Sequence, residues 1–286
     1  MAFWPVKPGP VPGFFISDAM QTLITHLSNN NNALQRGWQL GDGHFTTIHA
    51  YQGRLCHWSY HQARLAEAGR KLQLAELDWP QLYQRAVNAL DGSDQVLRIT
   101  VVRGRGARGY GIAGSGCSQV ILTTTPFPAH YYQWQQQGLQ IGVCEGRLGT
   151  SPLLVGLKTI NRLEQVLLKA ELDAKGWPEA VVLNEQEQVC EGVSANIFWR
   201  RGAHIYTPSL TRSGVWGTAR AWCQKQLGER LKLTEAPLSE LLRADEVWLT
   251  NALMGIMPVT GIAEQSFTLG ALTQDLQKAF INETII

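Results

Sequence analysis

The chain has 286 residues, of which 44% are hydrophobic and 17% are charged, a composition typical of a globular protein with a packed core. The formal net charge of +2 gives no reason to expect a nucleic acid or a membrane surface as a partner. Five widely spaced cysteines without a CxxC pair argue against a disulfide framework and a zinc site, and the histidines show no metal-ligand spacing. No apolar run approaches the ~20 residues of a spanning helix, and the N-terminus lacks the pattern of a secretory signal, so we expect a cytoplasmic protein.

The first half of the chain predicts a small α/β domain, residues 1–125. Residues 46–51 favour a strand, and Gln52-Gly53 turns the chain into a second strand at 54–58. Two helices are expected next, near residues 65–74 and over 79–90, where leucine and alanine recur at helical spacing. Two strands rich in β-branched residues follow at 96–102 and 119–124, and a Gly/Arg loop, 103–116, separates them.

Residues 126–137 contain two prolines, and we interpret them as the linker to a larger C-terminal domain, residues 138–286. This half predicts a strand at 138–144, a helix at 158–174 with Leu163, Val166 and Leu167 on one face, and a meander of strands over 180–199. A helix at 218–231 and a strand at 246–250 are expected further on. Because strands outnumber helices and do not alternate with them, we predict a mixed α+β fold of two domains and not a Rossmann sheet.

A lysine and a glutamate stand in apolar surroundings. Lys158 follows several aliphatic residues and Gly156, and burial of such an amine would lower its pKa and leave the uncharged form that Schiff-base chemistry needs. Glu191 lies in the apolar meander beside a glycine turn, where it could pair with a cationic ring nitrogen. Taken alone, each feature is more often structural: a lysine that reaches solvent from an apolar patch, and a solvated turn carboxylate.

Several segments are typical of anion binding. His61 and Arg64 lie three residues apart, so on a helix they would share one face and could bind a phosphate, although surface pairs of this kind are common. Residues 214–219 open a helix after two glycines, and helix N-termini present free N–H groups to anions. The Gly/Arg loop offers groups that suit the recognition of carboxylates, namely Arg103, Arg105, Arg108 and Tyr110.

Seven segments, taken in order, resemble the fold-type IV pyridoxal-phosphate enzymes, a group of branched-chain aminotransferases, D-amino-acid aminotransferases and aminodeoxychorismate lyases. They cover roughly residues 35–259 and are QRGWQLGDGHFTT, HQARL, the Gly/Arg loop, GLKTINRLEQVLLKAE, EGVSANIFW, GVWGTAR and NALMGIMPV. Within the group, the chain looks most like the lyases, which convert 4-amino-4-deoxychorismate to p-aminobenzoate and pyruvate. The resemblance implies pyridoxal 5'-phosphate as cofactor and a pseudo-barrel C-terminal domain. The alternatives are an aminotransferase on the same scaffold and a pyridoxal-phosphate-binding protein without turnover.

The resemblance also implies a role for each matching residue. Lys158 would bond to the cofactor aldehyde and then move protons, and Glu191 would keep the pyridine nitrogen protonated. The cofactor phosphate would be bound by Arg64, the backbone N–H groups of Thr218 and Ala219, and Asn251. The substrate carboxylate would be bound across the interface of a homodimer by Arg108 and Tyr110. Proton transfer would be assisted by Thr47 or, less expected, by Thr46.

Two departures from the family pattern stand out. Gln35 occupies the place of the usual aspartate before the first Arg-Gly, and the residues before it do not resemble the ordinary start of the family. Ala219 falls where the transaminases often place a phosphate-binding threonine, and the neighbouring Thr218 is the candidate to replace it.

Overall fold

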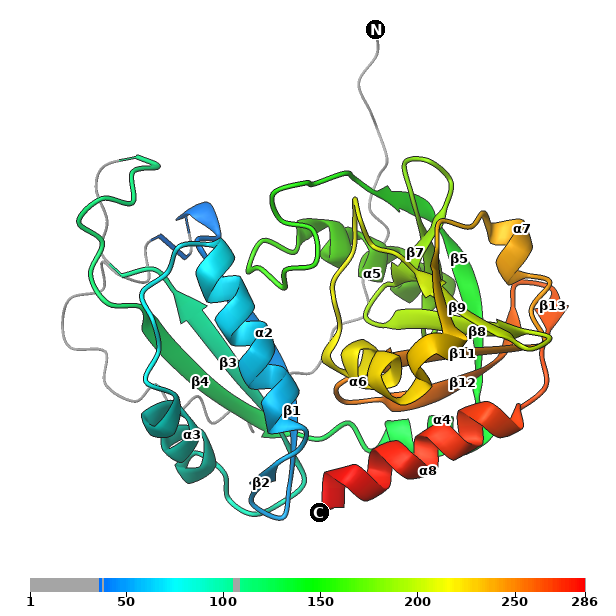
Figure 1. Cartoon of the computed structure of the whole chain (residues 1–286), viewed down its shortest axis with the longest axis horizontal. Helices are drawn as coiled ribbons and strands as arrows, with labels where there is room; N and C mark the ends of the chain where they lie inside the picture. The colour runs from blue at the N-terminus through cyan, green and yellow to red at the C-terminus, as the bar shows by residue number, and fades with distance from the viewer. Residues whose placement is uncertain (1–35, 38, 105–108, 286) are drawn as a thin grey trace, which may run out of the picture.

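The computed structural model describes residues 36–37, 39–104 and 109–285, and it consists of two units that lie side by side, each built on its own β-sheet (Figure 1). Strands of residues 43–126 form a four-stranded sheet, and strands of residues 139–266 form a nine-stranded sheet. The predicted mixed α+β fold with a smaller and a larger unit is therefore confirmed. Gln35 lies outside the described residues.

The small unit is an antiparallel sheet with the order β2-β1-β3-β4. Its strands are β1 (Gly43–Tyr51), β2 (Arg54–Leu55), β3 (Gln95–Val102) and β4 (Gln119–Pro126). One face is covered by the helices α2 (Trp58–Lys71) and α3 (Trp79–Asn88). Ile48 of β1 packs there against Leu65 of α2 and Leu82 of α3. Because side chains alternate along a strand, Phe45 and Thr47 lie on the opposite face, toward the large unit.

The large unit is a mixed sheet with the order β10-β9-β8-β11-β12-β5-β6-β7, to which β13 is added beside β12. Its strands are β5 (Leu139–Leu148), β6 (Ala180–Asn184), β7 (Val189–Gly192), β8 (Asn196–Arg201), β9 (His204–Pro208), β10 (Leu231–Thr234), β11 (Glu246–Asn251), β12 (Gly255–Ile262) and β13 (Gln265–Ser266). Strand β5 runs parallel to β6 and β12, and β9 runs parallel to β10. The other neighbouring strands are antiparallel.

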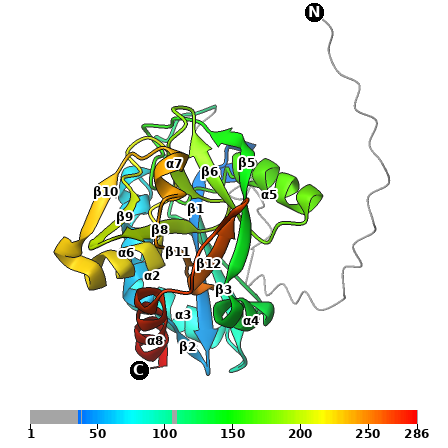
Figure 2. The ribbon, with the colours of Figure 1, turned by 90° about the vertical axis from the view of Figure 1, so that its right-hand side faces the viewer.

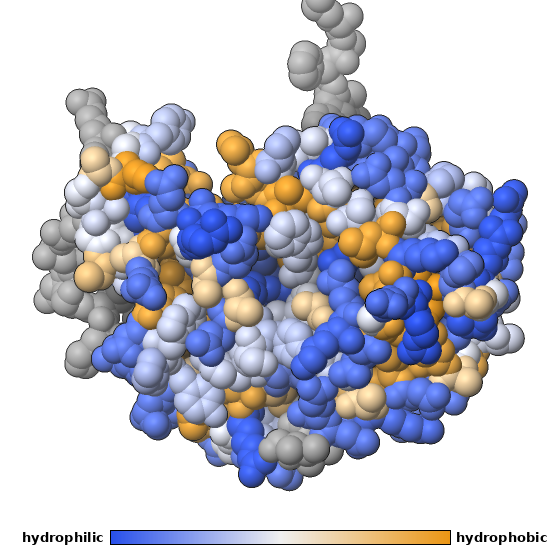
Figure 3. Space-filling model, in the orientation of Figure 1, coloured by the Kyte–Doolittle hydropathy of each residue, from blue (hydrophilic) through white to orange (hydrophobic). Residues whose placement is uncertain are grey.

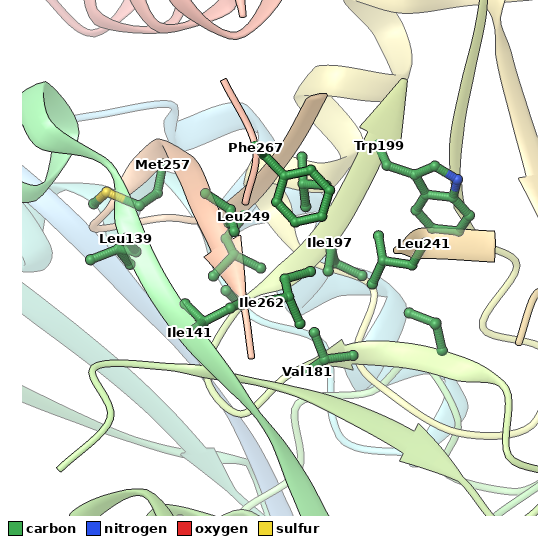
Figure 4. Packing of buried hydrophobic residues seen from close by; sticks show 14 of the residues in the cluster. Leu139, Ile141, Val181, Ile197, Trp199, Leu241, Leu249, Met257, Ile262 and Phe267 are labelled. Carbon is green, nitrogen blue, oxygen red and sulfur yellow. The ribbon is translucent and has the colours of Figure 1, made fainter. Parts of the chain in front are cut away.

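The core of the large unit explains the shape of its sheet. Val181 of β6 and Ile197 of β8 lie in one buried cluster with Ile141, Leu249 and Met257 (Figure 4). In the strand order, β6 and β8 are separated by β11, β12 and β5. The sheet therefore curls around this hydrophobic cluster, and its other face packs against helices of the same unit.

Helices flank this sheet on several sides (Figure 2). They are α4 (His130–Gln137), α5 (Leu163–Lys175), α6 (Thr218–Leu227), the 3₁₀ turn η1 (Gly228–Arg230), α7 (Leu238–Leu241) and α8 (Ala271–Ile285). Helix α5 lies on the side opposite to α6, and α4 lies beside α8, where Nε2 of Gln277 donates to the oxygen of Gln135 at 3.0 Å. Trp222 of α6 and Phe280 of α8 pack edge to face, with ring centroids 5.0 Å apart. Within the described residues, no helix is both long enough and apolar enough to cross a membrane.

The segment expected as a linker is more ordered than predicted. Residues 130–137 form α4, in which Tyr131 and Trp134 pack against the large core. Gln135 donates a hydrogen bond to the backbone oxygen of Met254 at 2.8 Å. The connection between the two sheets is thus built into the large unit. The prediction of a second strand over 54–58 was also too long, because β2 ends at Leu55 and Trp58 begins α2.

The helix predicted over 158–174 begins only at Leu163, and this start was wrong for a physical reason. The residues before it pair with β1 of the small unit. The amide of Phe45 donates to the oxygen of Lys158 at 2.9 Å, and the amide of Ile160 donates to the oxygen of Gly43 at 3.1 Å. These bonds hold Lys158 in an extended segment between the two units.

Candidate active site

A cavity of about 220 Å³ lies between the two units, whose surface is hollowed where they meet (Figure 3). Six residues that the sequence singled out line it: Thr47, Arg64, Lys158, Glu191, Thr218 and Asn251. They come from β1, α2, the segment before α5, β7, the start of α6 and the end of β11. Residues far apart in the chain are therefore brought together in one site.

Lys158 enters the cavity from the extended segment that β1 holds. The preceding Gly156 has φ +83°, and a Cβ at this position would lie 2.3 Å from the ring of Trp216, so only glycine lets the chain pass here. The amine lies 4.9 Å from the centre of the Phe45 ring. The pKa of Lys158 is lowered to about 7, chiefly by burial and also by the positive charges of Arg64 and Arg162, while Glu191 opposes this shift. A large share of this amine is therefore uncharged near neutral pH.

Glu191 is a buried carboxyl whose pKa is shifted in the direction opposite to that of Lys158. Its Oε2 accepts a hydrogen bond from the amide of Val215 at 2.9 Å and one from Nδ2 of Asn196 at 3.4 Å. Burial raises the pKa of Glu191 to about 7, although the Val215 amide and the charge of Lys158 act in the other direction. A cation bound next to this carboxyl would offset the free energy needed to hold a negative charge in a buried position. Glu191 is thus suited to face a positively charged ring nitrogen.

The start of α6 forms an anion-binding corner of the cavity. Gly217 is the N-cap, and the first helical hydrogen bond runs from the amide of Ala221 to the oxygen of Gly217. The amides of Thr218 and Ala219 therefore need no partner within the helix. Thr218 lines the cavity, whereas the side chain of Ala219 is buried in the core between α6 and α8. The side chain of Ala219 therefore does not reach the cavity.

Arg64 and two neighbours complete this corner. Nη2 of Arg64 donates to the oxygen of Trp216 at 3.0 Å, and its Nε is buried without a hydrogen-bond partner among the described residues. Thr250 Oγ1, in the same cavity wall, is likewise buried and without a partner there. Asn251 uses Oδ1 to accept from the amides of Leu253 and Met254, which fixes the turn after β11. Buried polar atoms without partners are costly unless a ligand satisfies them.

His61 does not join Arg64 in the cavity, so the idea that both bind one phosphate was wrong. Its Nδ1 lies 2.6 Å from Oγ1 of Thr46, and both side chains are buried between β1 and α2. Burial holds the pKa of His61 well below its usual value, and the charge of Arg64 adds to this effect. Thr47, one residue on, lines the cavity instead.

The Gly/Arg loop contributes nothing to the cavity wall within the described residues. Arg103 is buried, binds Asp42 at 2.9 Å and donates to the oxygens of Leu72 and Gln73, so it caps α2 and does not bind a ligand. Tyr110 is 87% exposed and does not line the cavity. Arg105 and Arg108 lie outside the described residues.

Several residues of the cavity wall were not singled out from the sequence, and two of them, Arg162 and Thr250, bear directly on its chemistry. Arg162 lies four positions after Lys158, in the quoted segment GLKTINRLEQVLLKAE, and that closeness was the available signal. Thr250 precedes Asn251 in the quoted turn, but nothing local showed that its hydroxyl would face the cavity. No cluster of three or more metal-binding side chains occurs among the described residues.

The sequence profile of amino-transferase class IV matches residues 43–262, which include every described element that lines the cavity. The chain belongs to the class IV aminotransferase family. An aminodeoxychorismate lyase of Vibrio harveyi is 41% identical over 250 residues, which is 85% of this chain and 92% of that protein. Among class IV structures, that of 4-amino-4-deoxychorismate lyase from Pseudomonas aeruginosa superposes with a TM-score of 0.80 at 36% identity, covering 86% of this chain and 93% of the other.

A more distant structure shares the fold alone. It is a hypothetical aminotransferase from Mycobacterium tuberculosis in a PLP-bound form, with a TM-score of 0.73 at 17% identity, covering 87% of this chain and 91% of the other. Proteins with different names thus share this architecture, and the fold by itself does not choose between a lyase and an aminotransferase.

Proposed function

We propose that this class IV chain is a pyridoxal-phosphate-dependent lyase that converts 4-amino-4-deoxychorismate to p-aminobenzoate and pyruvate. The observation that carries the proposal is the meeting of Lys158 and Glu191 in one cavity, each with its pKa moved to about 7 by burial. An amine that is partly uncharged and a carboxyl that lacks a cation are complementary to an aldehyde and a pyridine nitrogen. The relatives that carry the lyase name supply the substrate.

The cavity fits the cofactor. The orphaned Nε of Arg64 and Oγ1 of Thr250 lie in the wall that also contains Thr218, at the start of α6. A phosphate group would satisfy these atoms together with the free amides of Thr218 and Ala219. Asn251 would support them by fixing the turn that follows Thr250.

When bound, pyridoxal phosphate supplies an aldehyde carbon and a ring that accepts an electron pair. Lys158 would hold the cofactor covalently and, once displaced by the substrate amine, would remove the proton from C4 of the substrate. Glu191 would keep the ring nitrogen protonated, because the ion pair removes the cost of its own buried charge. The C3–O bond would then break, and the substrate's side chain would leave with its electron pair as the enolate of pyruvate, which takes up the proton removed from C4 to give pyruvate. The remaining ring becomes aromatic, which drives the reaction toward elimination.

Thr47 is proposed to assist proton transfer, since its side chain lies in the cavity wall. General acid–base help of this kind contributes about 10²–10⁴-fold to a rate. Arg108 and Tyr110 are proposed to bind a substrate carboxylate from a second copy of the chain. The exposed position of Tyr110, outside the cavity wall of its own chain, supports this arrangement.

We further propose a cytoplasmic homodimer. Leu163, Val166 and Leu167 form an apolar row on α5 and are 76%, 60% and 71% exposed. Leu153, in the loop that leads to Lys158, is 90% exposed. A partner surface that covers these side chains would bury them and bring a second Gly/Arg loop to the site. Four buried cysteines without disulfides suit the reducing cytoplasm: Cys56, Cys144, Cys190 and Cys223.

The test is an assay of the purified protein with 4-amino-4-deoxychorismate, in which pyruvate and p-aminobenzoate are measured separately. Both should appear in equal amounts, and the Lys158→Ala variant should form neither. Lys169→Ala is the matched control, because Lys169 is an exposed lysine paired with Asp173 on α5. Its activity should equal that of the unaltered chain.

Formation of p-aminobenzoate by Lys158→Ala would contradict the role of Lys158. A different outcome would assign a different reaction. If the chain transfers the amino group of a D-amino acid or a branched-chain amino acid and converts the cofactor to its amine form, it is an aminotransferase. A protein that binds the cofactor but acts on neither class of substrate would be a binding protein without turnover.

A further inference from the structure

Arg162 binds the backbone on both sides of Lys158. Its Nη2 donates to the oxygen of Leu157 at 2.8 Å, and its Nε donates to the oxygen of Thr159 at 3.0 Å. Nη2 also donates to Oγ1 of Thr159 at 2.8 Å. The planar guanidinium thus spans the three residues that have Lys158 at their centre. Lysine could not make these bonds in the same geometry, because its ammonium is a single point of contact.

The bonds of Arg162 complete a frame that begins in the small unit. Phe45 of β1 donates its amide to the oxygen of Lys158, and Ile160 donates its amide to Gly43. Thr159 is 2% exposed and pairs with His44 of β1. One side of the segment is therefore held by β1 and the other by Arg162. Without the arginine, the oxygens of Leu157 and Thr159 would lose their side-chain donor next to the reacting amine.

We propose that Arg162 is a positioning residue for Lys158, which fixes the backbone on both sides of this lysine and places a permanent positive charge in the same cavity. The inference rests on the proposed function only in that Lys158 is the reacting amine. Arg162 would act through Lys158 and not through contact with the substrate. Three of its hydrogen bonds are directed at its own chain segment, which is the geometry of a support.

The charges around Lys158 agree with this role. Arg64 approaches from α2, Arg162 from the start of α5, Arg98 from β3 and Glu191 from β7. After burial, the charges of Arg64 and then Arg162 lower the pKa of Lys158 most, and Glu191 is the one that raises it. Loss of the Arg162 charge should therefore raise the pKa of the amine and reduce its uncharged fraction at neutral pH.

The experiment measures the pKa of Lys158 directly in the full-length chain freed of cofactor. Each lysine is labelled with a trace of acetic anhydride at a series of pH values, and the labelled peptides are quantified by mass spectrometry. Arg162→Met removes the charge and should raise the pKa of Lys158 by about one unit, which reduces its labelling at pH 7 about five-fold. Arg162→Lys keeps the charge and should leave the pKa near its original value.

Hydrogen exchange separates positioning from charge. The amide of Ile160 should exchange about ten-fold faster in both variants, because both lose the guanidinium bonds that hold the segment. Arg147→Met is the matched control: Arg147 also donates to three backbone oxygens, those of Cys144, Glu145 and Gly146, but lies outside the cavity wall. It should change neither the pKa of Lys158 nor the exchange of Ile160.

An unchanged pKa in Arg162→Met would overturn the role of the charge. Unchanged exchange of Ile160 in Arg162→Lys would overturn the positioning role, and this variant decides the question even if Arg162→Met fails to fold. No substrate or cofactor is present in either measurement. A failure here is therefore distinct from a failure of the proposed lyase reaction.

Discussion

Thr46 Oγ1 lies 2.6 Å from Nδ1 of His61 on the helix-covered side of β1, while the next residue, Thr47, lines the cavity on the other side. The sequence alone left open which of the two threonines assists proton transfer. The alternation of side chains along β1 separates their surroundings. Thr46 is 0% exposed and holds α2 to the small sheet, and Thr47 is the one that a ligand can reach.

Exchanging each threonine for valine should separate these roles. Thr46→Val leaves the buried ring of His61 without its partner, so it should lower the free energy of unfolding by about 1–3 kcal/mol. Thr47→Val removes a hydroxyl from the cavity wall, so it should lower kcat about 10²-fold and change stability by less than about 0.5 kcal/mol. Urea unfolding and steady-state kinetics measure the two effects. If Thr47→Val retains full kcat while Thr46→Val loses it, the assignment is reversed.

Glu191 should make the cofactor-free chain less stable as the pH rises. Its pKa in the folded chain is about 7, above the ordinary value of 4.5, so folding favours the protonated form. Its contribution to stability is fully present below pH 4.5 and is lost as the pH rises through 7. Glu191→Gln, which cannot ionise, should therefore gain stability relative to the unaltered chain between pH 5 and 8, by up to about 3 kcal/mol.

Urea unfolding of both proteins at several pH values measures this difference. Glu187→Gln is the control, because Glu187 is an exposed carboxylate whose pKa is held low by its hydrogen bond to Arg147. The stability of that variant relative to the unaltered chain should not rise over the same range. If the difference in free energy of unfolding between Glu191→Gln and the unaltered chain stays constant from pH 5 to 8, Glu191 is already ionised at pH 5 in the folded chain.

Glu179 should support the cavity from behind. It is buried and accepts hydrogen bonds from the amides of Val193 and Ser194, at 2.7 and 3.1 Å, and from Oγ of Ser194. Val193 and Ser194 line the cavity, so this carboxyl fixes the turn that follows Glu191. Glu179→Gln would point an amide donor at these donors and should cost about 2 kcal/mol of stability. It should also raise KM more than it lowers kcat.

Ser194→Ala is the matched control for Glu179→Gln, because it removes only the hydroxyl and leaves the two amide bonds in place. Its loss of stability should be smaller than that of the glutamine variant. Equal effects of the two changes would show that the hydroxyl bond alone fixes the turn.

The elements of the fold followed from local patterns, but the site depended on contacts between distant segments. Alternating and helical periodicity placed β1, β3, β4 and α3 within a few residues of their observed bounds. The same periodicity extended α5 back to Lys158, because local spacing carries no sign of the bonds from Phe45 and Ile160 that keep this segment extended. The lysine was found through the resemblance and its apolar neighbours, not through its predicted helix.

The apolar face of α5 shows a second limit of periodicity. Leu163, Val166 and Leu167 share one face as predicted, yet they are exposed, and α5 buries Leu168 and Leu172 instead. A helical pattern indicates that a face is apolar but does not say what covers it. In the described chain, the core takes one face of α5 and leaves the other exposed.

Charging this exposed face should therefore separate the proposed dimer. Leu167→Glu places a carboxylate where Leu167 is 71% exposed in a single copy, so the monomer should fold and keep its stability. In a dimer the same change would bury an unpaired charge, which is strongly unfavourable. We expect light scattering to show a dimer for the unaltered chain and a monomer for the variant. Lyase activity should fall with dimer content, since the partner would carry Arg108 and Tyr110 away from the site.

Leu233→Glu is the matched control for the dimer, because Leu233 is 54% exposed on β10, at the edge of the large sheet. This variant should remain dimeric and active. A monomeric unaltered chain with full activity would refute the shared site, since the substrate carboxylate would then be bound without a second Gly/Arg loop. A dimer that survives Leu167→Glu would place the interface on another face, because a carboxylate buried at the centre of an apolar contact costs several kcal/mol.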